Sequence, residues 1–334
     1  MKSLFSIIIL FVITFLWPIF FSSYKVELER LGQMHRCFED RQIPCRWTPV
    51  SEYGYGIPLF NYLPPTPFYF GELIYFMTGS LSLSTKAIYL MPFLISLLFI
   101  WTLIRLIKEV NMSSMLVLAV SVAILLSSNN LLSIIFLSVT ITWIIFHYLK
   151  KRDKIIVIFF YSIIIGILLS SFYLLPLIFE RNLVHSIKVN GNSINYLPVS
   201  VSEVPKGYTE ESFQILTGES EIFDFKQGSN YINFKTETRT HTIIRLSQPY
   251  FPNWKIFIDG KETNVEYKNN SLGLMTIILG KGDHVISGRF FDTPIRIISN
   301  VLTIATFLFI LLLFLYQKKW VKRWISYYKK GIGH

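Results

Sequence analysis

Charged side chains are scarce in this sequence. Only 16% of its 334 residues are charged, 52% are hydrophobic, and the mean hydropathy is +0.46. Soluble globular proteins carry roughly 25% charged residues. The composition therefore excludes an ordinary soluble protein and indicates a membrane protein.

The motifs that mark common soluble enzymes are missing. The sequence has no Walker A loop, no G-x-G-x-x-G after a strand, no G-x-S-x-G and no H-E-x-x-H. Its six histidines are scattered, which argues against a histidine-based metal site. The residues alone therefore predict no metal site and no cofactor.

Cysteine is nearly absent as well, with only Cys37 and Cys45, eight positions apart. In an oxidising compartment the two could close a small disulfide around the turn between them. Two free thiols are the alternative, and the spacing leaves both open.

Long apolar runs are what the sequence has in abundance. A run of about 20 residues can cross a bilayer core of roughly 30 Å. The first run has an apolar core too long for a signal peptide and no A-x-A site after it, so we predict an uncleaved helix there. Together the runs predict six transmembrane helices, one of them short, at 4–22, 84–107, 114–128, 131–149, 155–178 and 295–316.

The basic residues indicate how these helices are oriented. Lysine and arginine are retained on the cytoplasmic side of short loops. With six spans and a cytoplasmic N-terminus, 13 basic and only two acidic residues fall on that side, which accounts for the whole formal charge of +11. Topology and contact with anionic lipid explain this charge better than nucleic-acid binding does.

These features predict a polytopic α-helical membrane protein with both termini in the cytoplasm and an extracytoplasmic antiparallel β-sandwich before the last helix. Its predicted parts are the first helix (1–22), an extracytoplasmic loop (23–83) with an interfacial or re-entrant segment (67–79), four helices (84–178), the sandwich (179–293), the last helix (294–317) and a basic cytoplasmic tail (318–334).

The sandwich is predicted from period-two strands that begin at Asn230. YINFKTE, HTIIRLS, WKIFIDG, LGLMTIIL and HVISGRFF are short and rich in β-branched and aromatic residues. Asp259-Gly260 predicts a type I′ hairpin, and 280–283 predicts a second reversal. The segment PYFPNW (249–254) is interpreted as core packing rather than a ligand site. Other polar residues suggest no chemistry: His241 and His284 are interpreted as isolated, and Asp224, Asp259 and Asp283 as turn residues.

The segment from Ile43 to Gly71 is crowded with rings, prolines and glycines. Prolines and glycines oppose a spanning helix or an exposed strand edge. Aromatic rings with a polar tip suit the lipid headgroup layer. We therefore expect this layer to hold Trp47, Tyr53, Tyr55, Phe60, Tyr62 and Tyr69.

Candidate chemistry is confined to the first predicted loop. Its carboxylates are Glu27, Glu29, Glu39, Asp40 and Glu52. Glu72 interrupts an apolar run, so it is either functional at membrane depth or turned to water at the interface. The planar fork of Arg46 suits a phosphate oxygen; alternatively it stacks on Trp47 or pairs with Glu39 or Asp40.

Three strings resemble a known family. QIPCRWTPVSEYGYGIPLFNYLPPTPFYFGEL (42–73), PYFPNWKIFIDGKE (249–262) and FFDTPIRIISNVLTIATFL (290–308) resemble the YfhO and pyruvoyl-tetrahydropterin synthase-related bacterial membrane proteins of the GT-C glycosyltransferase superfamily. The resemblance implies a protein of the bacterial cytoplasmic membrane that moves sugars from polyprenyl-phosphate donors at the outer face, with membrane lipids as its other partners.

The resemblance also implies particular site residues. Glu27 and Glu29 are the candidate catalytic carboxylates, as base or as ligands of a divalent metal ion. The lipid-phosphate and substrate-binding candidates are Arg46, Trp47, Tyr55, Asn61 and Glu72. Two departures from the family pattern support an alternative: Tyr24 and Lys25 occupy the usual acid position, and the chain is internally shortened after Val110. The alternative is a non-catalytic envelope protein that keeps the lipid-binding loop and presents its sandwich to a partner. A transporter is a weaker third reading, since we see no inverted repeat.

Overall fold

The structure is a computed structural model that describes residues 24–49, 56–148, 154–181, 187–189, 192–194, 212–270 and 273–331. The first predicted helix, at 4–22, lies outside this part of the chain. The chain divides into two compact units. We call Tyr89–Leu174 with the chain from Ile298 the helical unit, and Ser23–Ile88 with Leu175–Ile297 the mixed unit.

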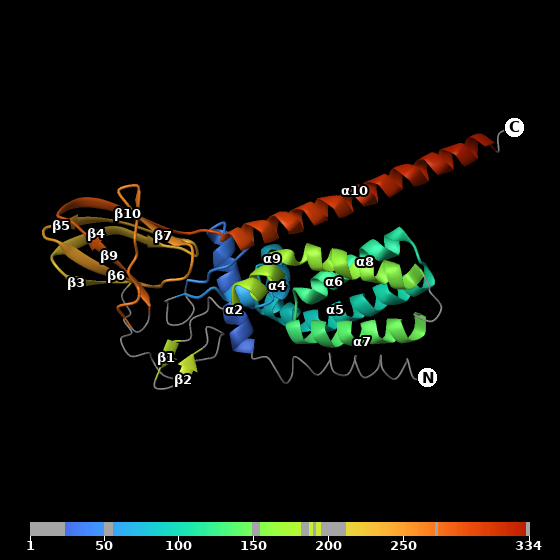
Figure 1. Cartoon of the computed structure of the whole chain (residues 1–334), viewed down its shortest axis with the longest axis horizontal. Coiled ribbons are helices and arrows are strands. Elements are labelled where there is room, and N and C mark those ends of the chain that lie inside the picture. The colour runs from blue at the N-terminus through green and yellow to red at the C-terminus, as the bar shows by residue number, and fades with distance from the viewer. Residues whose placement is uncertain are drawn as a thin grey trace. The chain divides into compact units, whose positions relative to one another are not determined.

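Long apolar helices form the helical unit (Figure 1). They are α5 (Leu81–Lys108), α6 (Met112–Leu126), α7 (Asn130–Tyr148), α8 (Lys154–Leu169), α9 (Ser171–Phe179) and α10 (Pro294–Gly331); α5, α9 and α10 continue into the mixed unit. Small residues allow close packing here. Gly166 of α8 lies against Val122 and Ala119 of α6, where a Cβ would stand 2.6 Å from a Val122 methyl. The Thr102 and Ser121 hydroxyls share a 2.8 Å hydrogen bond between α5 and α6.

Fewer helices qualify as membrane spans than the sequence predicts. Within the described residues, two helices are long and apolar enough to cross a bilayer, α5 and the Pro294–Tyr316 part of α10. A third span results if α8 and α9, bent by 75° at their junction, count as one. The predicted spans at 114–128 and 131–149 correspond to the shorter apolar helices Met112–Leu126 and Asn130–Thr142. The prediction of six spans therefore lacks support, because apolar runs were counted by composition and not by the length of straight helix they form.

In the mixed unit, three helices precede the sheets: α2 (Tyr24–Glu39), α3 (Leu59–Tyr62) and α4 (Thr66–Thr78). Leu31, Met34 and Cys37 recur at helical spacing and form the buried face of α2. Gly71 lets α4 approach its neighbours, since a Cβ there would stand 2.7 Å from Ile88 and 3.1 Å from Leu31.

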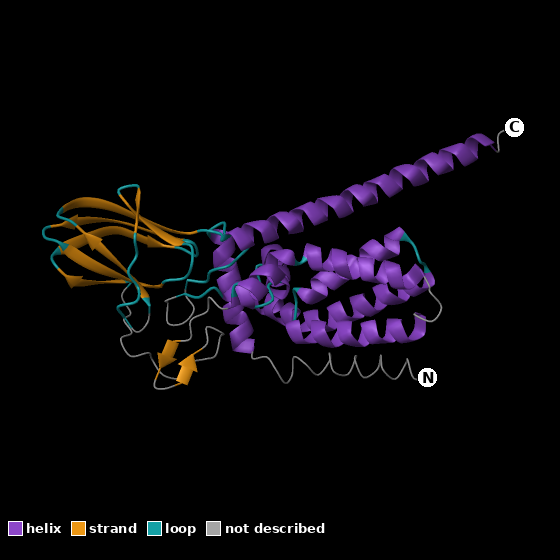
Figure 2. Ribbon diagram, in the orientation of Figure 1, coloured by secondary structure: helices purple, strands orange, loops and turns teal. Residues whose placement is uncertain are grey.

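Two antiparallel sheets share one core in the second half of the mixed unit (Figure 2). One sheet has the order β4-β5-β10-β7-β8 and the other β3-β6-β9, while β1 and β2 pair separately. The strands are β1 (Ile187–Val189), β2 (Asn192–Ile194), β3 (Phe213–Thr217), β4 (Ser220–Gln227), β5 (Tyr231–Thr238), β6 (Thr242–Pro249), β7 (Trp254–Ile258), β8 (Lys261–Thr263), β9 (Leu274–Leu279) and β10 (Gly282–Phe290). The predicted antiparallel strands are confirmed, because β5, β6, β7, β9 and β10 coincide with the five alternating strings.

The two predicted reversals of the sandwich are confirmed. Asp259 and Gly260 both have positive φ, of 52° and 79°, as a type I′ turn requires, and Ile258 pairs with Lys261 across them. The second reversal takes the chain from β9 in one sheet to β10 in the other.

Two aspartates are not the turn residues that the sequence suggests. Asp283 lies in β10 opposite Glu237. Asp224 lies within β4 at positive φ, where the register with β5 shifts between Phe223 and Lys226. A β-bulge tolerates this conformation inside a strand, and a sequence pattern does not distinguish a bulge from a turn.

Candidate functional site

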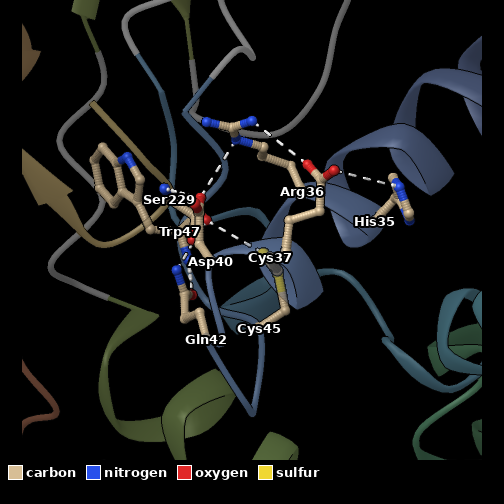
Figure 3. A network of polar contacts seen from close by, with 9 residues as sticks. His35, Arg36, Cys37, Asp40, Gln42, Cys45, Trp47 and Ser229 are labelled. Atoms are coloured by element: carbon tan, nitrogen blue, oxygen red, sulfur yellow. Dashed lines mark hydrogen bonds and ion pairs between the residues drawn. A yellow bond between two sulfur atoms is a disulfide. The ribbon is translucent and has the colours of Figure 1, made fainter. Parts of the chain in front are cut away.

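The Arg46-Trp47 pair lies on a tightly held turn that follows α2. A disulfide joins Cys37, in the last turn of α2, to Cys45, with Cα atoms 5.6 Å apart, and a cis peptide bond precedes Pro44. The Gln42 side-chain oxygen accepts hydrogen bonds from the backbone N–H groups of Arg46 and, at 2.8 Å, of Trp47. Figure 3 shows Gln42 beside Trp47. The turn is thus fixed by covalent and polar bonds on the chain itself.

Trp47 belongs to the core of the sandwich. Its side chain is 1% exposed and packs with residues of both sheets. Its ring centroid lies 5.7 Å from that of Trp254, 5.9 Å from Phe251 and 5.5 Å from Phe290. The prediction that Trp47 lies in the headgroup layer is therefore wrong. The packing role predicted for PYFPNW is confirmed, because Phe251 and Trp254 are core residues.

The packing of Trp47 explains why a glycine occupies position 56. The φ of Gly56 is +81°, which favours glycine, and a Cβ there would lie 2.5 Å from the Trp47 indole nitrogen. The backbones of Thr48 and Ile57 pair on either side of this contact, at 2.9 and 3.0 Å. Gly56 therefore lets the backbone before Ile57 lie directly against the indole.

Asp40 attaches the end of α2 to the sandwich at a second point. Its carboxylate accepts a 2.5 Å hydrogen bond from the Ser229 backbone N–H, in the turn between β4 and β5. Gly228 allows this approach, since a Cβ there would lie 2.9 Å from the carboxylate. Figure 3 shows Asp40 directed toward Ser229, with Arg36 on its other side. Asp40, which the sequence suggested as a partner of Arg46, therefore joins α2 to the sandwich.

Arg46 points into a buried charged cluster. It is 2% exposed and donates a 3.3 Å hydrogen bond to the side-chain oxygen of Asn61, which is fully buried. Burial lowers the pKa of Arg46 to about 10, with Arg296 acting in the same direction, while Asp292 and Glu180 raise it. The structure thus brings two predicted binding residues together, within the protein interior.

The same cluster contains an ion pair that the sequence interpretation missed. Arg296 at the start of α10 holds Glu180, which directly follows α9, through two 2.8 Å contacts, and both residues are at most 1% exposed. The Thr293 hydroxyl also donates to Glu180, and the Tyr62 hydroxyl donates to its backbone carbonyl at 2.8 Å. Burial, reinforced by Glu180, raises the pKa of Tyr62.

A signal for this ion pair was present in the sequence. A charge within an apolar run is a functional or structural candidate. Arg296 lies in the run 295–316, and Glu180 lies two positions after the end of the run 155–178. Glu72, the charge considered functional from the sequence, thus shares this signal with Arg296 and Glu180.

Glu72 forms a separate polar pair with His35. The carboxylate of Glu72 lies 2.7 Å from His35 Nδ1 and is 7% exposed, so the alternative in which it turns to water is wrong. Its second oxygen, Oε2, is buried with no hydrogen-bond partner among the described residues. The Tyr75 ring packs edge-on against the imidazole at 4.9 Å. Glu39 lies 3.8 Å from Nε2, and the imidazole side chain remains 36% exposed.

The remaining predicted site residues are dispersed. Glu27 forms a 2.9 Å ion pair with Arg30 on α2, and Glu29 is exposed on the same helix. Tyr55 lies outside the described residues. In the described ranges no three His, Cys, Asp or Glu side chains gather as they would around a metal ion. His284, interpreted as isolated, instead bonds to Asp259 at 2.7 Å.

No model of a known protein family matches this chain, and no curated protein matches it either. The family resemblance drawn from the motifs remains a prediction.

Proposed function

We propose that this chain is a multi-pass protein of the bacterial cytoplasmic membrane that holds its β-sandwich at the outer face and presents it to a partner, without transferring sugar itself. The burial of the Arg46-Trp47 pair is the observation that carries this proposal. In the resemblance these residues would meet a lipid-linked phosphate. Here the indole fills the sandwich core, and the guanidinium lies among Asn61, Glu180 and Asp292.

Energetics favour this structural reading of the motif. To reach a ligand, the Trp47 indole would have to leave the core. The lost packing of a buried tryptophan typically costs about 3–5 kcal/mol in free energy of unfolding. The neighbouring residues support the same role, because Gln42, Gly56 and the disulfide all fix the turn that carries Trp47. The aromatic segment thereby attaches the sandwich to the helices of the mixed unit.

The membrane part of the proposal is supported by composition and charge. At least two described helices have the length and hydropathy of spans. The six spans predicted from the sequence would place the segments with the excess of basic residues on one side, in agreement with the positive-inside rule. Both termini would then be cytoplasmic, and the mixed unit would lie outside.

A second candidate function is the GT-C-like transfer itself, and the His35–Glu72 pair favours it. A buried carboxylate that accepts a hydrogen bond from Nδ1–H would leave Nε2 as a proton acceptor on a partly exposed ring. In such a reaction the acceptor hydroxyl would give its proton to Nε2 while its oxygen bonds to the sugar. The bond from sugar to phosphate would break, and the polyprenyl phosphate would leave.

One experiment separates the two candidates. Membranes containing the protein are incubated with radiolabelled polyprenyl-phosphate sugars, and transfer to an acceptor is measured. We expect no transfer above that of membranes lacking the protein. Transfer by the wild type that is lost in His35→Ala and Glu72→Gln, but kept in the control Glu237→Gln on the exposed face of β5, would establish the transferase and overturn our proposal.

Presentation to a partner has its own test. A photo-crosslinking amino acid is placed at exposed positions of the sandwich, Phe223, Val285 and Glu262, in living cells. We expect a discrete adduct from at least one position, and its loss when Trp47→Ala is added. Absence of any adduct from all three positions would contradict the proposal.

A further inference from the structure

The junction between α4 and α5 exposes large apolar side chains in the mixed unit. Phe76 is 86% exposed and Met77 74%, and their neighbours Leu73, Leu81 and Leu83 are exposed too. The opposite face of α4 is packed, with Phe68, Gly71 and Glu72 buried. We call residues 73–85 the apolar tip. Burying one large apolar side chain is worth roughly 1.5–3 kcal/mol, so a tip left in water would be unfavourable.

Charge is absent from the apolar tip. From Leu73 to Thr85 the sequence has no Asp, Glu, Lys or Arg, although Glu72 precedes the tip and Lys86 follows it. Glu72 is turned inward to His35, and Lys86 is exposed. An exposed surface with this composition matches a lipid environment, where a charged side chain would be costly.

Four hydroxyl groups of the tip, those of Thr78, Ser80, Ser84 and Thr85, form hydrogen bonds within the tip itself. The Thr78 hydroxyl donates to the Ile74 carbonyl at 2.8 Å, that of Ser84 to Ser80 at 3.0 Å, and that of Thr85 to Leu81 at 2.8 Å. The Ser80 hydroxyl oxygen accepts from the Leu83 N–H, and the Gly79 N–H donates to the Tyr75 carbonyl at 2.7 Å. In a lipid environment no water is available as a partner, so the polar groups of a turn must form their hydrogen bonds within the protein.

From these three observations we infer that the apolar tip inserts into the acyl region of the outer leaflet and binds lipid. It is continuous with α5, a candidate span of 28 residues, so insertion needs only that α5 crosses the same bilayer. The segment predicted as interfacial or re-entrant, 67–79, is thereby sharpened. Its first half packs on protein, and its second half, extended to Thr85, contacts lipid. A second copy of the chain or bulk water are the competing occupants.

Spin-label accessibility tests the inference on the full chain. Phe76→Cys is labelled with a nitroxide in nanodiscs of phosphatidylethanolamine and phosphatidylglycerol, and its collisions with oxygen and with a water-soluble nickel complex are compared. The native cysteines form a disulfide, so the label attaches only at the introduced cysteine. Phe223→Cys on β4 is the aqueous reference, and Leu308→Cys on α10 is the reference inside a candidate span; both sites are exposed.

Each outcome is decisive. We expect the Phe76 label to have an oxygen-to-nickel collision ratio well above that of Phe223 and at or below that of Leu308. A ratio equal to that of Phe223 would place the tip in water. Low collision rates with both reagents would place it against protein. Either of these results overturns the inference, and neither bears on whether the sandwich meets a partner.

Discussion

At the scale of single residues, the Trp47 indole fills a position in the sandwich core that no strand residue supplies. It contacts rings from β7, β10 and the segment before β7. Because its partners lie about 200 positions away in the sequence, no local pattern in 43–71 could place it. Only the tertiary fold distinguishes a buried ring from an interfacial one.

Trp47→Ala should therefore destabilise the sandwich strongly. Replacing a buried tryptophan costs about 3–5 kcal/mol in free energy of unfolding, through lost packing and the cavity left behind. A urea titration in mild detergent, followed by the circular dichroism of the sheets, measures this. The matched control is Trp101→Ala, since Trp101 is 54% exposed on α5. Equal midpoints for the two variants would contradict the core role of Trp47.

The Asp259–His284 pair makes the sandwich sensitive to acid. The hydrogen bond from His284, and then that from the Val285 N–H, hold the pKa of Asp259 below its ordinary value of 3.8. A carboxyl with a depressed pKa contributes stability above its unfolded pKa and loses that contribution as the pH falls through the folded pKa. The contribution of Asp259 to the free energy of unfolding should thus be complete above about pH 5 and decline below about pH 4.

We expect the thermal midpoint to fall less steeply over this interval in Asp259→Asn than in the wild type. His284→Ala should flatten the dependence partly, because the Val285 N–H still bonds the carboxylate. Thermal melts at several pH values measure both. Parallel pH curves for all three proteins would show that the pair contributes nothing.

At the scale of elements, period-two strands and the Asp-Gly turn were predictable, because their signals lie within a few residues. The membrane spans were less predictable from the sequence. Composition alone does not show that the apolar run 155–178 bends by 75° between α8 and α9. The pairs Arg46–Asn61 and His35–Glu72 each join two segments of the predicted loop. Arg46, Asn61 and Glu72 were candidates from the sequence, whereas His35 and both pairings were not.

The joint between α9 and α10 rests on Glu180 and Arg296. Removing one partner of a buried pair leaves an uncompensated charge, at a cost of about 3–5 kcal/mol. Arg296→Met should therefore destabilise the protein strongly. The double variant Glu180→Gln with Arg296→Met should recover most of the lost stability. The remaining charges of Arg46 and Asp292 have opposite signs and still compensate each other. Urea titrations measure both, and a double variant as unstable as the single one would show that the joint depends on shape and not on charge.

At the scale of the whole molecule, two units with different chemistry share one chain. The helical unit consists mainly of apolar helices, whereas the mixed unit is fixed by a disulfide, a buried ion pair and a ring cluster. Disulfides persist mainly in oxidising compartments. The Cys37–Cys45 bond therefore agrees with an extracytoplasmic mixed unit, independently of the basic residues from which the topology was predicted.

Labelling in intact cells tests this topology. Single cysteines replace Lys261, exposed in the β7–β8 hairpin, and Lys329 in the basic tail, and a membrane-impermeant maleimide is added. We expect Lys261→Cys to react in intact cells and Lys329→Cys to react only after the membrane is opened, because the positive-inside rule predicts a cytoplasmic position for a basic tail. The wild type is the background control, since its cysteines are bonded. Reaction of the tail in intact cells, or protection of the hairpin, would place the mixed unit on the cytoplasmic side and remove the basis for presenting the sandwich outside.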